Sequence, residues 1–221
     1  MRWVDRGLAP SGVAYYARTY TYLWVQHFQQ GIGGRPDQHN YWTVFASDLR
    51  EQFHQKCGYC ERSFESTGEL QSSVDHFQPR SRFPHLVYEW GNWVSSCQRC
   101  NFTKDDQWPD TGYVDPCASD WLERPEEYFD YAPTTGEIIA KPSLAGDGSR
   151  KAQSTIDDIG LNETRLRESR FRLMSALVQD LLLAAPGQDR EAVVSRYQEP
   201  DQPHVGAIAM FVEQLRRAGM I

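Results

Sequence analysis

Two Cys-x-x-Cys pairs, Cys57/Cys60 and Cys97/Cys100, constrain this chain of 221 residues more than any other feature of its sequence. Each pair presents two thiolates from one turn, and four thiolates satisfy the tetrahedral preference of Zn²⁺. The separation of the pairs exceeds that of a compact zinc ribbon, so the chain between them has to form a unit that returns to its start. We therefore predict one structural zinc ion per chain, with no open coordination position.

Other uses of the cysteines stay open, namely buried thiols without metal and a redox-active pair. Disulfide bonds are not expected, because the sequence shows no signal peptide and contains 5 cysteines, an odd number. The cysteine outside the two pairs is Cys117, and nothing near it in the sequence would lower its pKa. We interpret it as an inert thiol.

The polar residues between the cysteine pairs resemble, in type and spacing, the motif of the HNH (ββα-metal) nucleases. Asp75-His76 is followed by Asn92, and Asn101 comes nine residues after Asn92. The resemblance implies a first strand that ends near His76, a second strand, and a short helix that carries Asn101. Lys104 lies one turn beyond Asn101 on the same helical face.

Phosphodiester hydrolysis needs an activated water and a cation near the developing negative charge. We predict that His76 is the general base, because its ordinary pKa near 6.5 suits proton transfer at neutral pH. Asp75 and Asn101 are predicted to hold Mg²⁺ or Mn²⁺, since hard cations prefer oxygen ligands. Asn92 is predicted to tie the loop together and orient His76. A lone histidine or asparagine is more often a core or turn residue, so the prediction depends on the joint spacing.

Charge is distributed unevenly along the chain. The formal net charge is −7, which is unusual for a protein that binds nucleic acid. Residues 76–104, in contrast, contain four basic residues against Glu89 alone. We predict a basic cleft there, and a partner that supplies the remaining affinity. The predicted phosphate contacts are Arg80, Arg82, Arg99 and Lys104.

Hydrophobic periodicity predicts an α+β fold that is mainly helical. The resemblance implies a ββα-metal (HNH) core, which contains the structural four-cysteine zinc site and is flanked by N- and C-terminal helices. Helices are expected at about 11–30, 41–55, 149–159, 163–184 (with Asn162 as N-cap), 189–198 and 203–218, and a β-hairpin at 127–141. The predicted regions are an N-terminal helical segment (1–56), a zinc-braced nuclease core (57–106), a loop and hairpin (107–148), and C-terminal helices for partner docking or scaffolding (149–221).

Two helices have unusual compositions. The first contains Tyr15, Tyr16, Tyr20 and Tyr22, for which we favour packing on the core over a stacking or partner surface. The long C-terminal helix begins with four arginines in eight residues, for which we favour a solvated face over contacts with phosphate or an acidic partner. These arginines are Arg165, Arg167, Arg170 and Arg172.

Four longer motifs restrict the resemblance to one group of HNH nucleases. They are similar to the HNH subunit of bacterial Septu anti-phage systems, a group that includes effectors of some retrons. The motifs are Cys-x-Tyr-Cys-Glu, Val-Asp-His-Phe-x-Pro, Tyr-x-Trp-x-Asn and Ser-Cys-x-x-Cys-Asn-x-x-Lys. The resemblance implies an effector nuclease in antiviral defence, with nucleic acid as target and an ABC/SMC-like ATPase as partner. We favour DNA as substrate, while RNA, including tRNA, stays open. No apolar stretch is long enough to span a membrane, so we expect a cytoplasmic protein.

Two alternatives from other classes remain. One is a catalytically silent, zinc-stabilised subunit that binds nucleic acid or acts as an adaptor. The other is a stand-alone restriction-type HNH nuclease, although the sequence shows no separate basic recognition domain.

Overall fold

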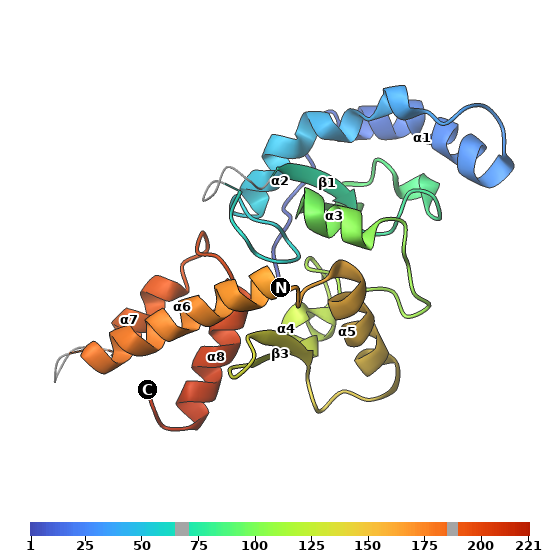
Figure 1. Cartoon of the computed structure of the whole chain (residues 1–221). Coiled ribbons are helices and arrows are strands. Elements are labelled where there is room, and N and C mark those ends of the chain that lie inside the picture. Colours follow the sequence, from blue (N-terminus) through green and yellow to red (C-terminus); the bar gives the residue numbers. More distant parts are fainter. Residues whose placement is uncertain (65–70, 185–189) are drawn as a thin grey trace.

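The computed structural model describes residues 1–64, 71–184 and 190–221. Within these residues the fold is α+β and mainly helical, with two separate two-stranded antiparallel sheets. Figure 1 shows α1, α2, β1 and α3 in one half of the molecule, and β3 with α4 to α8 in the other. The N-terminus lies between the two halves. The predicted fold class is confirmed.

The element boundaries follow the predicted periodicity closely. The helices are α1 (Val13–Gln30), α2 (Ala46–Gln52), α3 (Gln98–Lys104), α4 (Pro125–Tyr128), α5 (Gly146–Ile159), α6 (Thr164–Leu183), α7 (Arg190–Tyr197) and α8 (Val205–Arg217). The strands are β1 (Ser72–His76), β2 (Trp93–Cys97), β3 (Phe129–Ala132) and β4 (Glu137–Ala140). Short 3₁₀ turns are η1 (Asp37–His39), η2 (Tyr41–Phe45), η3 (Pro84–Leu86), η4 (Trp90–Asn92) and η5 (Trp121–Glu123).

Two predictions of helix boundaries need comment. The helix expected over 41–55 is divided into η2 and α2, because a 3₁₀ turn aligns side chains three residues apart and so buries both Trp42 and Phe45. The helix expected at 189–198 is α7, and residue 189 lies outside the described residues. The predicted regions 57–106 and 149–221 each contain one of the stretches that are not described.

The nuclease-like core is built from β1, β2 and α3. β1 pairs with β2 so that Asp75 lies opposite Val94 and His76 opposite Trp93. The first cysteine turn packs directly on this hairpin, where the Gly58 amide donates to the Ser95 carbonyl at 2.7 Å. A Cβ at Gly58 would approach Phe53 to 2.5 Å and Val94 to 2.9 Å, so the turn fits the hairpin only with glycine.

The C-terminal half is held by a buried arginine of α6. Arg170 is 2% exposed and donates to the carbonyls of Gly136 and Leu161 and to the side chain of Asn162, at 2.8 to 3.0 Å. The interpretation of the α6 arginines as a solvated face is therefore wrong for Arg170. Asn162 is also not the predicted N-cap, because its amide is used by both backbone groups of Ile138.

Among the described residues, no helix combines the length and the apolar character needed to cross a bilayer.

Removing the Arg170 side chain is expected to destabilise the fold. An Arg170→Ala change leaves several buried acceptors without a donor, so we expect the free energy of unfolding to fall by about 3 kcal/mol. Arg172→Ala, on the exposed side of the same helix, should change it by less than about 0.5 kcal/mol. Urea unfolding followed by circular dichroism measures both values, and equal stability of the two variants would contradict the assignment.

Candidate active site and metal centre

Four cysteine side chains converge at one buried point. The Sγ atoms of Cys57, Cys60, Cys97 and Cys100 all lie within 4.8 Å of one another. The Cys60 and Cys97 sulfurs are 3.9 Å apart, and a tetrahedron with metal–sulfur bonds of about 2.3 Å places its corners about 3.8 Å apart. The cluster therefore fits a four-coordinate metal ion with no position open to substrate.

The local environment favours a metal-binding thiolate at Cys97. This residue ends β2 at the start of α3, where its sulfur accepts from the Cys100 amide. Hydrogen bonds from Cys100 and the other two thiols lower the pKa of Cys97. Cys117 differs, because burial raises the pKa of its thiol to about 12.

Substitution of single cysteines tests whether the four clustered cysteines, unlike Cys117, bind a metal ion. Cys→Ser at position 57, 60, 97 or 100 is expected to remove the bound metal and much of the folded structure, because ligand binding and folding are coupled at such sites. Cys117→Ser should retain both. Elemental analysis of purified protein, with circular dichroism before and after chelation, gives the answer. Metal retained after loss of a cluster cysteine would contradict the assignment.

His76 is held in one orientation at the end of β1. Its Nε2 lies 2.9 Å from the Val87 carbonyl. Because a carbonyl only accepts, Nε2 carries the hydrogen and Nδ1 carries the lone pair. Burial, with a further contribution from Arg80, lowers the pKa of His76 to about 3. The ring is therefore neutral at neutral pH, and it is a weaker base than the ordinary pKa near 6.5 assumed in the prediction of a general base.

Asp75 is buried beside a counter-charge. The Lys104 ammonium lies 3.1 and 3.3 Å from its two oxygens and also donates to the His76 carbonyl at 2.9 Å. The Tyr59 hydroxyl donates to the same carboxylate. The prediction that Lys104 contacts phosphate is therefore wrong. The Lys104 side chain is fully buried, because the buried Asp75 carboxylate requires a charge partner inside the protein.

The two asparagines have separate structural tasks. The Asn92 amide bonds both backbone groups of Gln78, at 2.8 and 3.0 Å, and ties the loop after β1 to the start of β2. Among the described hydrogen bonds it makes none with His76, which is oriented by Val87 instead. Asn101 donates from Nδ2 to the Ser73 hydroxyl at 3.0 Å. Its amide oxygen is of the type that hard cations prefer.

A small pocket brings together three of the predicted catalytic residues, Asp75, His76 and Asn101, whereas Asn92 and Lys104 do not line it. Its volume is about 140 Å³, room for roughly four waters. Because Lys104 compensates the charge of Asp75, the remaining charges of the pocket are Asp105 and Asp106 against Arg80, a small negative excess that suits a cation. The prediction of a basic cleft is wrong at this point. The lining residues are Val74, Asp75, His76, Pro79, Arg80, Asn101, Asp105 and Asp106.

The three arginines predicted to bind phosphate have different surroundings in the structure. Arg80 lines the pocket with its guanidinium over the rings of Trp24 and Trp42, 5.5 and 5.2 Å from their centroids. Arg82 donates to the Trp108 carbonyl. Arg99 forms an ion pair with Glu163, and its contact with phosphate stays a prediction.

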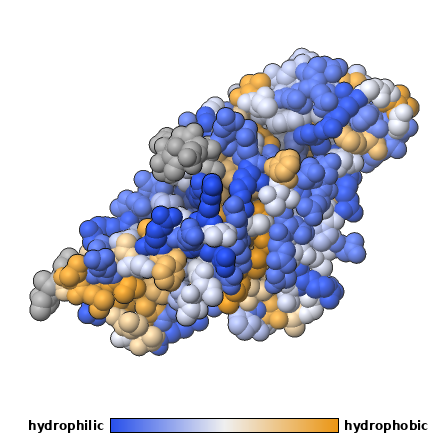
Figure 2. Space-filling model, in the orientation of Figure 1, coloured by the Kyte–Doolittle hydropathy of each residue, from blue (hydrophilic) through white to orange (hydrophobic). Residues whose placement is uncertain are grey.

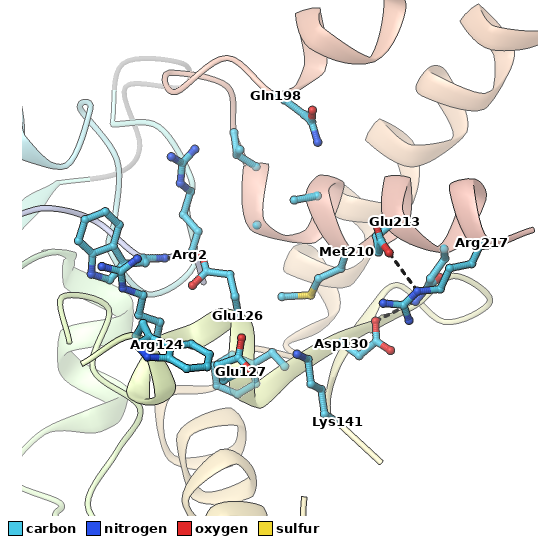
Figure 3. A pocket seen from close by; sticks show the side chains of 17 residues that line it. Arg2, Arg124, Glu126, Glu127, Asp130, Lys141, Gln198, Met210, Glu213 and Arg217 are labelled. Carbon is cyan, nitrogen blue, oxygen red and sulfur yellow. Dashed lines mark hydrogen bonds and ion pairs between the residues drawn. The ribbon is translucent and has the colours of Figure 1, made fainter. Parts of the chain in front are cut away.

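A larger hollow of about 640 Å³ lies between α4, β3 and α8 (Figure 3). Among its lining residues Glu213 pairs with Arg217 on α8, and the Asp130 carboxylate accepts a hydrogen bond from Gln214. Arg124 covers the Trp3 ring. Basic and acidic side chains are balanced here, so we assign the chemistry to the smaller pocket.

Several residues of the site were not predicted. Tyr59 binds Asp75, Ser73 positions Asn101, and the Trp42 ring meets the His76 ring edge-on at a centroid distance of 4.7 Å. Tyr59 lies inside the Cys-x-Tyr-Cys motif, which could have drawn attention to it. Nothing in the sequence signals the other two.

Comparison with known proteins agrees with this geometry. Residues 57–107 match the family described as HNH endonuclease. The chain is similar to the Septu protein PtuB of Bacillus mycoides (strain KBAB4), with 26% identity over 182 residues, covering 68% of this chain and 58% of that protein. It is also similar to the Septu protein PtuB of Bacillus thuringiensis, with 39% identity over 56 residues, 25% of this chain and 21% of that protein. The chain thus spans less than two thirds of the length of these relatives. The predicted resemblance to HNH nucleases and to the Septu subunit is confirmed.

Proposed function

We propose that this protein is a metal-dependent endonuclease that hydrolyses phosphodiester bonds of nucleic acid. One observation carries the proposal: a single acidic pocket contains His76, whose hydrogen-bonded Nε2 leaves Nδ1 as the proton acceptor, together with Asp75 and Asn101. An oriented base beside oxygen ligands for a cation is the arrangement that phosphodiester hydrolysis requires.

Each residue has a defined role in the proposed reaction. His76 accepts the proton of the attacking water through Nδ1 while Val87 holds the ring in place. Lys104 and Tyr59 keep the Asp75 carboxylate oriented within the protein. Asn92 fixes the loop that leads to Val87. Arg80, at the pocket wall, is the arginine best placed to contact phosphate.

Two different metals fit the two donor sets. Four buried thiolates favour a structural Zn²⁺ ion at the cysteine cluster. Asp75 and Asn101 supply oxygen ligands for Mg²⁺ or Mn²⁺, which would neutralise charge on the scissile phosphate. A carboxylate has several lone pairs, so Asp75 can bind a cation while it still accepts hydrogen bonds from Lys104 and Tyr59.

The biological role that we propose is the effector nuclease of an anti-phage defence system, with an ABC/SMC-like ATPase as partner. The similarity to Septu PtuB supports this role. The net charge of −7 supports a partner, because so acidic a chain has little general attraction for nucleic acid. We favour DNA as substrate and keep RNA, including tRNA, as the alternative.

Loss of the base is expected to abolish cutting. With Mg²⁺ or Mn²⁺, the wild type should cut plasmid DNA or total tRNA, and His76→Ala should lower the rate at least about 100-fold, since general-base catalysis contributes about 10²–10⁴-fold. EDTA should stop the reaction. His85→Ala, which changes an exposed histidine of the following loop, is the matched control and should cut at the wild-type rate.

The outcomes separate the alternatives. Cutting that survives His76→Ala would contradict the role of this residue. A wild type that stays inactive even with the ATPase would favour the silent adaptor. Sequence-specific cutting of DNA without any partner would favour the stand-alone nuclease.

The ATPase is expected to bind the exposed apolar end of α6. Figure 2 shows a hydrophobic patch there, and Leu182 and Leu183 are 76% and 74% exposed. A Leu182→Asp/Leu183→Asp double change should therefore prevent co-purification with the ATPase, whereas Gln179→Asp on the same helix should not. The nuclease rate without partner should be the same in all three proteins. Unchanged co-purification of the double variant would exclude this surface.

A further inference from the structure

The segment that contains α1 differs in charge from the rest of the chain. Residues 6–36 contain three arginines and no acidic residue, although the whole chain has a formal charge of −7. Figure 1 shows α1 in the same half of the molecule as β1 and α3, at its outer edge. The longest stretch without acidic residues thus lies at the nuclease end, where a polyanion would approach.

The tyrosines of α1 form a cluster of rings with the η1–η2 segment. Tyr16 stacks on Tyr41 with centroids 4.7 Å apart, and Tyr20 stacks on His39 at 4.8 Å. Tyr20 also lies 4.8 Å from Tyr41. Tyr15 meets Tyr16 edge-on at 5.3 Å, at the open side of the cluster. Together these five residues make up the ring cluster.

Packing alone does not explain the choice of residues in the ring cluster. The indoles of Trp24 and Trp42, 0% and 5% exposed, fill the interior of this interface. The members of the ring cluster are half-buried, and Tyr15 is 53% exposed. Tyr16, Tyr20, Tyr41 and His39 stack on one another, so Tyr15 at the edge of the cluster is the ring that offers an open face to a nucleobase.

Ring contacts connect the ring cluster to the catalytic histidine. Tyr16 lies 6.4 Å from Tyr88, Tyr88 lies 6.0 Å from Trp42, and Trp42 meets His76 at 4.7 Å. α1 also packs on η3, directly before the Val87 carbonyl that orients His76. The ring cluster does not line the pocket itself, and it is connected to His76 through Tyr88 and Trp42.

We propose that the ring cluster is a stacking platform for unpaired nucleotides next to the phosphodiester bond at His76. Bases that pair in a duplex keep their faces covered by their neighbours, whereas unpaired bases can stack on the tyrosines. The substrate is accordingly a single strand or an unpaired loop. This inference rests on the proposed nuclease function and narrows its substrate class.

The test uses the full chain with His76→Ala, so that the probe stays intact. The probe is a single-stranded oligonucleotide of about 20 nucleotides containing 2-aminopurine, long enough to cover a single-strand binding groove, prepared as DNA and as RNA, with the corresponding duplex for comparison. We expect quenching of 2-aminopurine and tighter binding of the single strand than of the duplex. Tyr15→Ala should weaken single-strand binding about 5- to 100-fold, the range expected for a lost base–aromatic stack.

Controls within α1 separate stacking from stability. Tyr22, which is 55% exposed on the same helix and makes no described ring contact, is the matched control, and Tyr22→Ala should bind as the parent does. Tyr15→Trp should restore binding and quenching. Equal losses for Tyr15→Ala and Tyr22→Ala, no preference for single strands, or no binding by the parent would each overturn the platform.

Cleavage by the chain with His76 intact is measured in parallel. If that chain cuts single strands and duplexes equally, the platform is wrong while the nuclease function stands. If the His76→Ala chain shows the stacking signature but the chain with His76 intact does not cut even with the ATPase, the catalytic proposal fails instead.

Discussion

The convergence of four cysteine sulfurs is the constraint on which the nuclease core depends. The cluster joins the turn after α2 to the end of β2 and the first turn of α3. Asn101 follows Cys100 directly, so the position of the cluster fixes the face of α3 that carries Asn101. β1 is paired with β2, and Lys104 on α3 bonds the Asp75 carboxylate and the His76 carbonyl at the end of β1. A metal at the cluster would thus determine the catalytic geometry without taking part in the reaction.

The electrostatics of the pocket are compatible with the proposed action of an acidic protein on a polyanion. Asp75 is neutralised internally by Lys104, while Asp105 and Asp106 add negative charge to the pocket wall. A divalent cation is attracted to such a site and, once bound, reverses its local charge. The chain therefore needs no broad basic surface at the scissile bond. Affinity elsewhere has to come from ring stacking or from a partner.

The sequence was most informative where chemistry is local. Cysteine spacing and the Asp-His, Asn, Asn pattern identified the residues that the structure brings together, because ligand types and short spacings are encoded directly in the chain. The sequence did not predict which charged side chains pair with which groups in the fold. Lys104 pairs with Asp75 across 29 residues, and Arg170 is buried against Gly136 across 34. Such pairings form between polar groups that the tertiary fold removes from water. Hydrophobic periodicity in the sequence does not show which groups these are.

The most direct test of the two metal sites is anomalous diffraction from crystals of His76→Ala grown with Mn²⁺ and a bound oligonucleotide. We predict zinc scattering at the centre of Cys57, Cys60, Cys97 and Cys100, and manganese scattering beside Asp75 and Asn101 in contact with a phosphate oxygen. Manganese bound away from Asp75 and Asn101, or a phosphate held on the far side of the molecule, would contradict the assignment of this pocket as the site of hydrolysis.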